Sequence, residues 1–202
     1  MDIYHTRENY LIMKKIFTLA AAMLLTLSSM AQEAGHLQFK GIPLDGNYKV
    51  FAQKLVQKGF RQLDARDGII NLSGTFLGQQ DVLVSVNASP GTDVVYSVVA
   101  LLEAEATWAK VESLYRGTVE VYKDKYGEPK SQVEKFSGDP RTDLAKLTYL
   151  KNGQCNFITK WKTAEGEIYV FPVYTGGKYF ISCTYMDKQN IKAQHQSLLE
   201  DI

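Results

Sequence analysis

Apolar residues recur at helical spacing in two segments of the chain, and capping residues bound each segment. The first has apolar side chains at positions i, i+3, i+4, i+7 and i+8, namely Tyr48, Phe51, Ala52, Leu55 and Val56. Asp45 or Asn47 can cap the start of this helix, and Gly59 suits the left-handed residue that ends it. The second lies between Thr107 and Gly127 and has the same periodicity in Trp108, Val111, Tyr115, Val119, Tyr122 and Tyr126.

Shorter runs that favour β-structure lie before the first helix and between the two. We expect strands at 37–44, 70–76, 82–86 and 94–102. Gly78-Gln79 suits a type II′ turn between the second and third of these, and residues 64–68 read as a plain turn. The last run is apolar at nearly every position, which is typical of a strand covered on both faces.

The chain after Gly127 indicates a second group of strands. Asn152-Gly153 is a strong hairpin signal, and residues 164–166 and 175–177 have turn composition. We therefore expect strands at 146–151, 154–162, 167–174 and 178–186, followed by a helix at 188–200. Tight hairpins join these strands, so they form an antiparallel meander.

The fold class that follows is α+β. Two halves, at about 37–104 and 105–202, each contain a helix and several antiparallel strands. One arrangement consistent with this order is a tandem repeat of helix-plus-meander halves that form one two-layer domain. The other is a single continuous sheet with both helices packed on one face.

Residues 13–31 have the three regions of a secretory signal. Lys14 and Lys15 precede an apolar run at 16–27, and small residues at 29 and 31 suit a peptidase site that would leave Gln32 first. The run has roughly 12 apolar residues, too few for a bilayer span of about 20. Residues 1–12 then represent a start assigned too early or a disordered tail. We expect residues 32–202 to be periplasmic or secreted, without a lipoprotein anchor because no cysteine lies at the predicted cleavage site.

The charge of the processed chain bears on its partners. Removing residues 1–31 takes three of the 23 basic residues and two of the 22 acidic ones, which leaves 20 of each. Binding to nucleic acid or to an anionic membrane surface needs a basic excess, so neither is expected. A protein or another cell-envelope component is the expected partner, with a glycan as a further candidate.

Several short motifs resemble those of a known group of proteins. Residues 39–46, Gly74-Thr75-Phe76-Leu77-Gly78 and Lys125-Tyr126-Gly127-Glu128-Pro129 are similar to segments of small exported proteins of uncharacterised function from gut Bacteroidetes. This resemblance implies an origin and export, and it carries no activity. The layout of the halves also resembles that of β-lactamase-inhibitor-like domains, which implies binding of other proteins through the exposed face of a sheet.

Metal and nucleophile chemistry have little support. His36 and His195 are the only histidines after the signal, and their spacing suits no metal site, so we expect no metal and no cofactor. Cys155 and Cys183 lie within strand patterns and are expected to be buried thiols. A disulfide would require a strand order that differs from the sequence order, because next-nearest strands lie roughly 9.5 Å apart.

Carboxylate pairs leave a hydrolase open as the alternative function. Four acids lie near expected strand ends or in loops, namely Glu103, Glu105, Asp139 and Asp143. A pair of them could supply acid and base in a cleft between the two halves, although each is equally consistent with solvated surface.

Aromatic residues are concentrated in the last strands. Tyr169 and Phe171 share one side of their strand while Tyr174 takes the other, so one face of the sheet can show aromatics outward. The alternative is that both faces are covered. We expect a non-catalytic binding module whose candidate binding residues are Trp161, Tyr169, Tyr174 and Tyr185, with Trp161 as the main exposed anchor.

Overall fold

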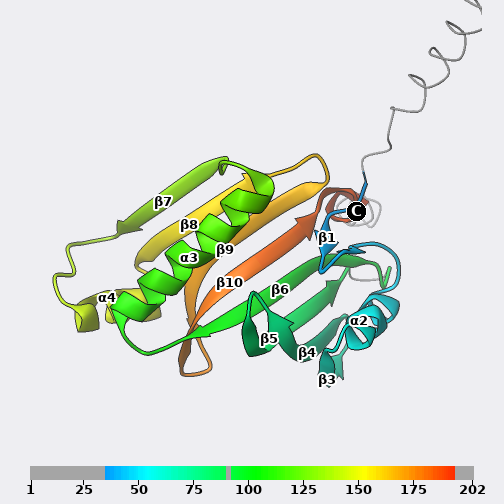
Figure 1. Cartoon of the computed structure of the whole chain (residues 1–202), viewed down its shortest axis with the longest axis horizontal. Coiled ribbons are helices and arrows are strands. Elements are labelled where there is room, and N and C mark those ends of the chain that lie inside the picture. The colour runs from blue at the N-terminus through cyan, green and yellow to red at the C-terminus, as the bar shows by residue number, and fades with distance from the viewer. Residues whose placement is uncertain (1–34, 90–91, 194–202) are drawn as a thin grey trace, which may run out of the picture. The chain divides into compact units, whose positions relative to one another are not determined.

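An eight-stranded antiparallel sheet is the frame of this protein, whose computed structural model describes residues 35–89 and 92–193 (Figure 1). Its strand order is β3-β4-β5-β6-β10-β9-β8-β7. The strands are β3 (Arg61–Arg66), β4 (Ile69–Phe76), β5 (Gln79–Ala88), β6 (Val95–Ala104), β7 (Ser131–Phe136), β8 (Cys155–Lys162), β9 (Gly166–Thr175) and β10 (Lys178–Asp187). Central strands β6 and β10 pair, with Ala100 opposite Cys183. The predicted α+β class is confirmed, and all eight strands form one continuous sheet.

The helices cover one face of this sheet. They are α2 (Tyr48–Gln57), α3 (Trp108–Tyr126) and α4 (Asp143–Lys151), and a small hairpin of β1 (Gln38–Phe39) and β2 (Ile42–Pro43) accompanies them. On α3, the Tyr122 hydroxyl lies 2.7 Å from that of Tyr185 on β10. The Phe39 ring of the hairpin contacts the ring of the same Tyr185. Helix α2 packs on β4 and β5, where the fully buried Leu72 and Val84 are paired on this same face.

The caps predicted for the two main helices are present. The Asn47 side chain accepts a hydrogen bond from the backbone N–H of Lys49 at 2.9 Å, so Asn47, and not Asp45, caps α2. Thr107 caps α3, and Gly127 ends it. Gly59 follows α2 with φ of +91°, a left-handed conformation that a side chain would strain. Local capping and a single apolar stripe were therefore sufficient to locate both helices.

The prediction of a strand at 146–151 is wrong, because these residues belong to α4. The Thr142 side chain accepts a hydrogen bond from the backbone N–H of Ala145 at 3.2 Å and so caps this helix. Asn152-Gly153 ends α4 instead of forming a hairpin, since Gly153 adopts φ of +71° directly after it. A glycine with positive φ is common both after the last turn of a helix and in a hairpin turn. The sequence around Asn152-Gly153 therefore did not distinguish a helix end from a hairpin.

Several strand boundaries also differ from the predictions. The expected strand at 37–44 is the β1–β2 hairpin, and the turn after β4 lies at Leu77-Gly78, where φ is positive at both residues. Edge strands β3 and β7 were not predicted, and residues 64–66 lie within β3. Every residue of β3 is exposed, so that strand has no alternating apolar pattern to detect. Strand β6 is not covered on both faces, because Glu103 is exposed on its second side.

The two cysteines are free. Cys155 lies on β8 and Cys183 on β10, and β9 separates these strands, so the predicted obstacle to a disulfide is present. Residues 188–193 are helical, and the rest of the helix predicted at 188–200 lies outside the described residues. The predicted signal at 13–31 and residues 1–12 also lie outside them. Within 35–89 and 92–193, no helix combines the length and the hydrophobicity that a bilayer crossing requires.

Candidate functional site

The candidate site is the second face of the sheet, opposite α2, α3, α4 and the β1–β2 hairpin, which we call the open face. Thr159 of β8 points to the helix side, where its hydroxyl lies 2.6 Å from that of Tyr115 on α3. Side chains alternate along a strand, so the next residue, Lys160, points to the open face. The pairing registers extend this assignment across the sheet in one row: Lys160, Tyr169, Thr184, Val99 and Ser85.

A neighbouring row on the open face is largely apolar. It runs across β9, β10, β6 and β5 through Phe171, Ser182, Leu101 and Leu83. Leu83 is 41% exposed, while Phe171 and Leu101 are half-buried among their neighbours. The solvated face of an antiparallel sheet is ordinarily polar, so this row stands out. Apolar groups with polar groups around them are the usual composition of a protein-binding surface.

Polar side chains on the open face are bonded to one another and so held in place. At the β5 end of the row that starts at Lys160, the Ser85 hydroxyl donates to Asn71 Oδ1 at 2.5 Å. At its β8 end, Lys160 Nζ lies 2.8 Å from Glu167 Oε1, and the Tyr169 hydroxyl donates to Glu167 Oε2. The Lys160 ammonium also lies 5.1 Å from the centre of the Tyr169 ring. The orientation of Tyr169 is therefore fixed before any partner binds.

These contacts keep the Glu167 carboxylate ionised. Its hydrogen bond with Lys160, and then that with Tyr169, lower the pKa of Glu167. The same bond with Glu167 raises the pKa of Lys160, and burial raises the pKa of Tyr169. All three groups stay in one protonation state near neutral pH, which suits a preformed binding surface better than proton transfer.

The candidate binding residues divide between the two faces. Trp161 is only 2% exposed, and its indole N–H donates to the Gly127 carbonyl at 2.8 Å, so the expectation of an exposed anchor is wrong. Tyr185 is also buried on the helix side. Tyr174 is half-buried on the helix side, with its ring 4.9 Å from that of Tyr179. Among the four candidates, Tyr169 alone lies on the open face.

A usable signal for the correct face was present in the sequence. Lys160 and Lys162 flank Trp161, and in a strand two flanking lysines point to the face opposite the residue between them. The lysines therefore mark the solvated side and place Trp161 in the core. Leu83 and Leu101 were missed because neighbouring valines in the same strands defined the buried face, and the leucines between them received no role.

A groove on the helix side is lined by residues at the end of β6 that include two of the candidate acids, Glu103 and Glu105, although strand alternation points the Glu103 side chain to the open face. Its volume is about 380 Å³, and it lies between α3, the end of β6 and the β4–β5 turn. Glu103 lies 2.9 Å from the Lys178 ammonium, and Glu105 lies 3.2 Å from that of Lys110. Both carboxylates are well exposed, at 55% and 73%, as in ordinary surface salt bridges. Asp139 is ion-paired with Arg141, and Asp143 lies in the first turn of α4.

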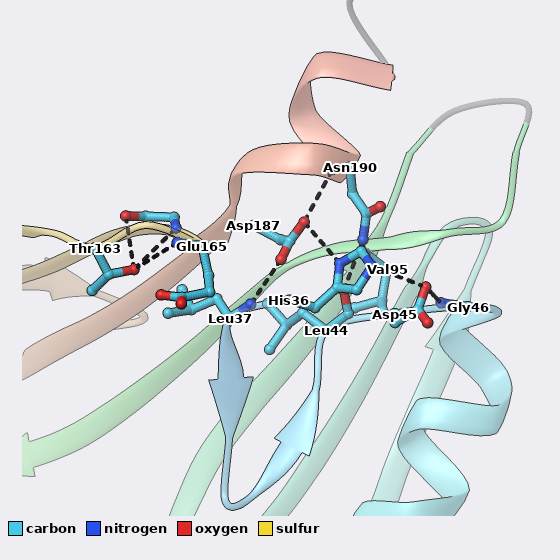
Figure 2. Close-up of polar contacts among 11 residues, drawn as sticks. His36, Leu37, Leu44, Asp45, Gly46, Val95, Thr163, Glu165, Asp187 and Asn190 are labelled. Carbon is cyan, nitrogen blue, oxygen red and sulfur yellow. Dashed lines mark hydrogen bonds and ion pairs between the residues drawn. The ribbon is translucent and has the colours of Figure 1, made fainter. Parts of the chain in front are cut away.

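His36 belongs to a buried polar cluster that joins the start of the folded unit to the end of β10 (Figure 2). The fully buried Asp187 carboxylate accepts hydrogen bonds from the backbone N–H groups of Leu37 at 2.9 Å and Asn190 at 3.0 Å. His36 Nδ1 lies 3.2 Å from the same carboxylate. The Asn190 side chain donates to two backbone carbonyls, those of Leu44 and Val95. His36 thus belongs to a cluster that stabilises the fold. His195 lies outside the described residues.

Neither cysteine is an activated nucleophile. Burial raises the pKa of Cys183 to about 12 and that of Cys155 to about 11. Both thiols are protonated near neutral pH, whereas a nucleophilic cysteine requires the thiolate. Within residues 35–89 and 92–193, no group of three or more His, Cys, Asp or Glu side chains is placed to hold a metal ion.

Three comparisons with known proteins give no relative from which the open face could be interpreted. No protein-family model, no curated protein and no solved structure matches this chain significantly. The open face is therefore interpreted from its own residues.

Proposed function

We propose that this protein is an exported, non-catalytic binding module that holds a protein or another cell-envelope component on the open face of its sheet. One observation carries the proposal. The helices and the β1–β2 hairpin all pack on one face, and the other face presents the apolar row of Phe171, Leu101 and Leu83 to solvent. An apolar row on a face that no described helix covers is a feature that a binding partner would use.

The position of the fold relative to the predicted signal supports export. The folded unit begins at His36, a few residues after the peptidase site predicted between Ala31 and Gln32. Cleavage there would release a chain that keeps the whole unit. The test is the N-terminal sequence of the protein recovered from the periplasm or the medium. Gln32 as the first residue supports export, and an unprocessed cytoplasmic chain contradicts it.

We also propose that the two halves are related as a tandem repeat. Helix α2 precedes strands β3 to β6, and α3 precedes β7 to β10, with α4 inserted after β7. In the sheet β6 and β10 are neighbours at the centre. Strands β5, β4 and β3 follow outward on one side, and β9, β8 and β7 follow in the same order on the other. This arrangement is consistent with the layout of β-lactamase-inhibitor-like domains noted above, and it would place a binding face over the junction of the halves.

Site-specific photocrosslinking tests the binding face directly. A photoreactive phenylalanine analogue replaces Leu83 on the open face, and the same analogue replaces Val121 of α3, which lines the groove on the helix side, as the matched control. The two side chains are similarly exposed, at 41% and 49%, so the reagent has equal access to solvent at both. The labelled proteins are expressed in a Bacteroidetes host and irradiated in intact cells.

Adducts from position 83 and none from position 121 support the proposal. The corresponding Leu83→Asp variant should remove the adduct formed by a probe at Leu101, whereas Val121→Asp should not, because only the first places a charge in the apolar row. Far-ultraviolet circular dichroism confirms that both variants fold. Crosslinks from position 121 instead would assign binding to the helix side and contradict the proposal.

The alternative function, a hydrolase, would use the groove on the helix side. Glu103 and Glu105 would be its acid and base, but both are exposed and ion-paired with lysines, and the Glu103 side chain points to the opposite face of the sheet. A general acid is ordinarily held in a site that excludes water. Glycan and peptide hydrolysis by the purified protein, compared with Glu103→Gln and Glu105→Gln variants, decides between the functions. Turnover that both variants abolish would favour the hydrolase.

A further inference from the structure

A second feature lies at one end of the sheet, where the β8–β9 turn meets the helix formed by residues 188–193. It is a pocket of about 380 Å³. Its apolar lining includes Met186 and Ile191, and three lysines lie around it: Lys162, Lys188 and Lys192. A volume of this size falls at the lower end of the range for small-molecule sites, which is roughly 300–1,000 Å³.

The charges around the pocket are not balanced. Its one carboxylate, Glu167, is engaged by Lys160 and by the Tyr169 hydroxyl. Within residues 35–89 and 92–193, no carboxylate lies at ion-pair distance from the ammonium groups of Lys162, Lys188 or Lys192. The chain expected after processing has no net charge, so acidic residues elsewhere offset this local excess of positive charge.

Hydrogen bonds hold the walls of the pocket in place, and Figure 2 shows those of Asp187 and Thr163. Asp187 accepts from the backbone N–H of Asn190 and so caps the helix that carries Lys188, Ile191 and Lys192. The backbone N–H of Lys188 donates to the Glu165 carbonyl at 2.9 Å, which fixes this helix to the β8–β9 turn. These contacts do not depend on a ligand, so the pocket is preformed.

The opposite wall depends on a glycine and a threonine. The Thr163 hydroxyl accepts from the backbone N–H groups of Glu165 at 3.2 Å and Gly166 at 3.1 Å. A Cβ atom at Gly166 would lie 2.2 Å from the Met186 carbonyl oxygen, so only glycine allows β9 to approach β10 this closely. Met186 is thereby held at the boundary between the pocket and the open face.

We propose that this pocket binds a single-chain anionic amphiphile, with its acidic head among the three lysines and its alkyl chain against Met186 and Ile191. Apolar walls beneath unpaired ammonium groups are complementary to a molecule with those two parts. A free fatty acid and a single-chain lipid phosphate share this chemistry. The pocket shares Glu167 with the open face, but the inference does not rest on the partner proposed there.

The test is isothermal titration calorimetry on residues 32–202, which contain the whole folded unit. The probes are dodecanoate, dodecyl phosphate and the uncharged dodecanol, each below its aggregation concentration. Both anions should bind, and dodecanol should bind at least about tenfold more weakly because it lacks the charge. Preference between the two anions distinguishes a fatty acid from a lipid phosphate as the source.

Two matched pairs of substitutions locate the site. Lys188→Gln with Lys192→Gln should weaken binding of both anions about tenfold and leave dodecanol unchanged. Lys54→Gln with Lys58→Gln, exposed on and beside α2, removes the same charge and should change nothing. Equal affinity for all three probes, or equal effects of the two pairs, would overturn the proposal. An absence of anion binding would also overturn it. If the Lys188/Lys192 variant then also loses the Leu101 crosslink, the pocket belongs to the surface that the protein partner uses.

Discussion

Replacement of Trp161 directly tests the packing of α3 against the sheet. Trp161 lies between Lys160 and Lys162, and its sequence context is compatible with a surface anchor, yet the side chain is 2% exposed. The indole ring packs 5.5 Å from the ring of Tyr122 on α3, and the indole N–H donates to Gly127, the residue that ends this helix. Replacing Trp161 with alanine should therefore disturb the contact between α3 and the sheet.

The expected loss of stability follows from these contacts. Truncation of a buried tryptophan to alanine costs about 3–5 kcal/mol in lost burial and cavity formation. Loss of the hydrogen bond leaves the Gly127 carbonyl without its partner, which adds about 1 kcal/mol. The sum, about 4–6 kcal/mol, approaches the whole stability of an ordinary domain, about 5–15 kcal/mol. For a unit of this size the melting temperature should fall by about 10–20 °C.

Chemical and thermal unfolding followed by circular dichroism measures this loss. Trp161→Phe keeps a buried ring but removes the N–H group and part of the indole volume, so its cost should be smaller than that of alanine, about 1–3 kcal/mol. Leu83→Ala on the open face is the control, with an expected cost of about 0.5 kcal/mol or less because Leu83 is 41% exposed. A Trp161→Ala protein within 1 kcal/mol of the wild type would refute the burial of Trp161 and return it to the list of binding residues.

Three further outcomes follow from buried groups. Burial raises the pKa of Cys155 to about 11 and that of Cys183 to about 12. A thiol reagent at pH 8 should therefore label neither cysteine in the folded protein and both in denaturant. Rapid labelling of Cys183 in the folded protein would contradict its burial. Asp187→Ala should cost about 2–4 kcal/mol in urea unfolding, because two backbone N–H groups lose their acceptor, and a change below 0.5 kcal/mol would be inconsistent with the cluster. Gly74→Ala should lower the melting temperature, because the added Cβ would lie 2.4 Å from the Phe60 ring. The double variant Gly74→Ala, Phe60→Leu should recover part of the loss. A Gly74→Ala protein with an unchanged melting temperature would count against this contact.

Elements with local signals were predicted well. Asn47 and Thr107 cap helices with apolar stripes, and both helices lie where those signals place them. The turns after β8 and β9 were also located correctly, because their composition has few alternatives. These features depend on interactions within a few residues of one another.

Elements that depend on contacts between distant parts of the chain were not predicted correctly. The sequence around Asn152-Gly153 suits a hairpin or a helix end, and the packing of Leu147 and Leu150 beneath α4 decides for the helix. Edge strand β3 has no apolar pattern, so its pairing with β4 becomes visible only in the sheet. The candidate site failed in the same way, because the burial of Trp161 and Tyr185 depends on which face α3 covers.

The sequence by itself determined the α+β class, the positions of α2 and α3, and the separation of Cys155 from Cys183, because hydrophobic periodicity, caps and tight turns act over short distances. Only the tertiary structure decided that the strands form one sheet with the helices on a single face. That choice depends on the pairing of β6 with β10, strands separated by most of the second half of the chain. The same pairing determines which side chains reach solvent, and so it placed Leu83, Leu101 and Tyr169 on the open face and Trp161 in the core.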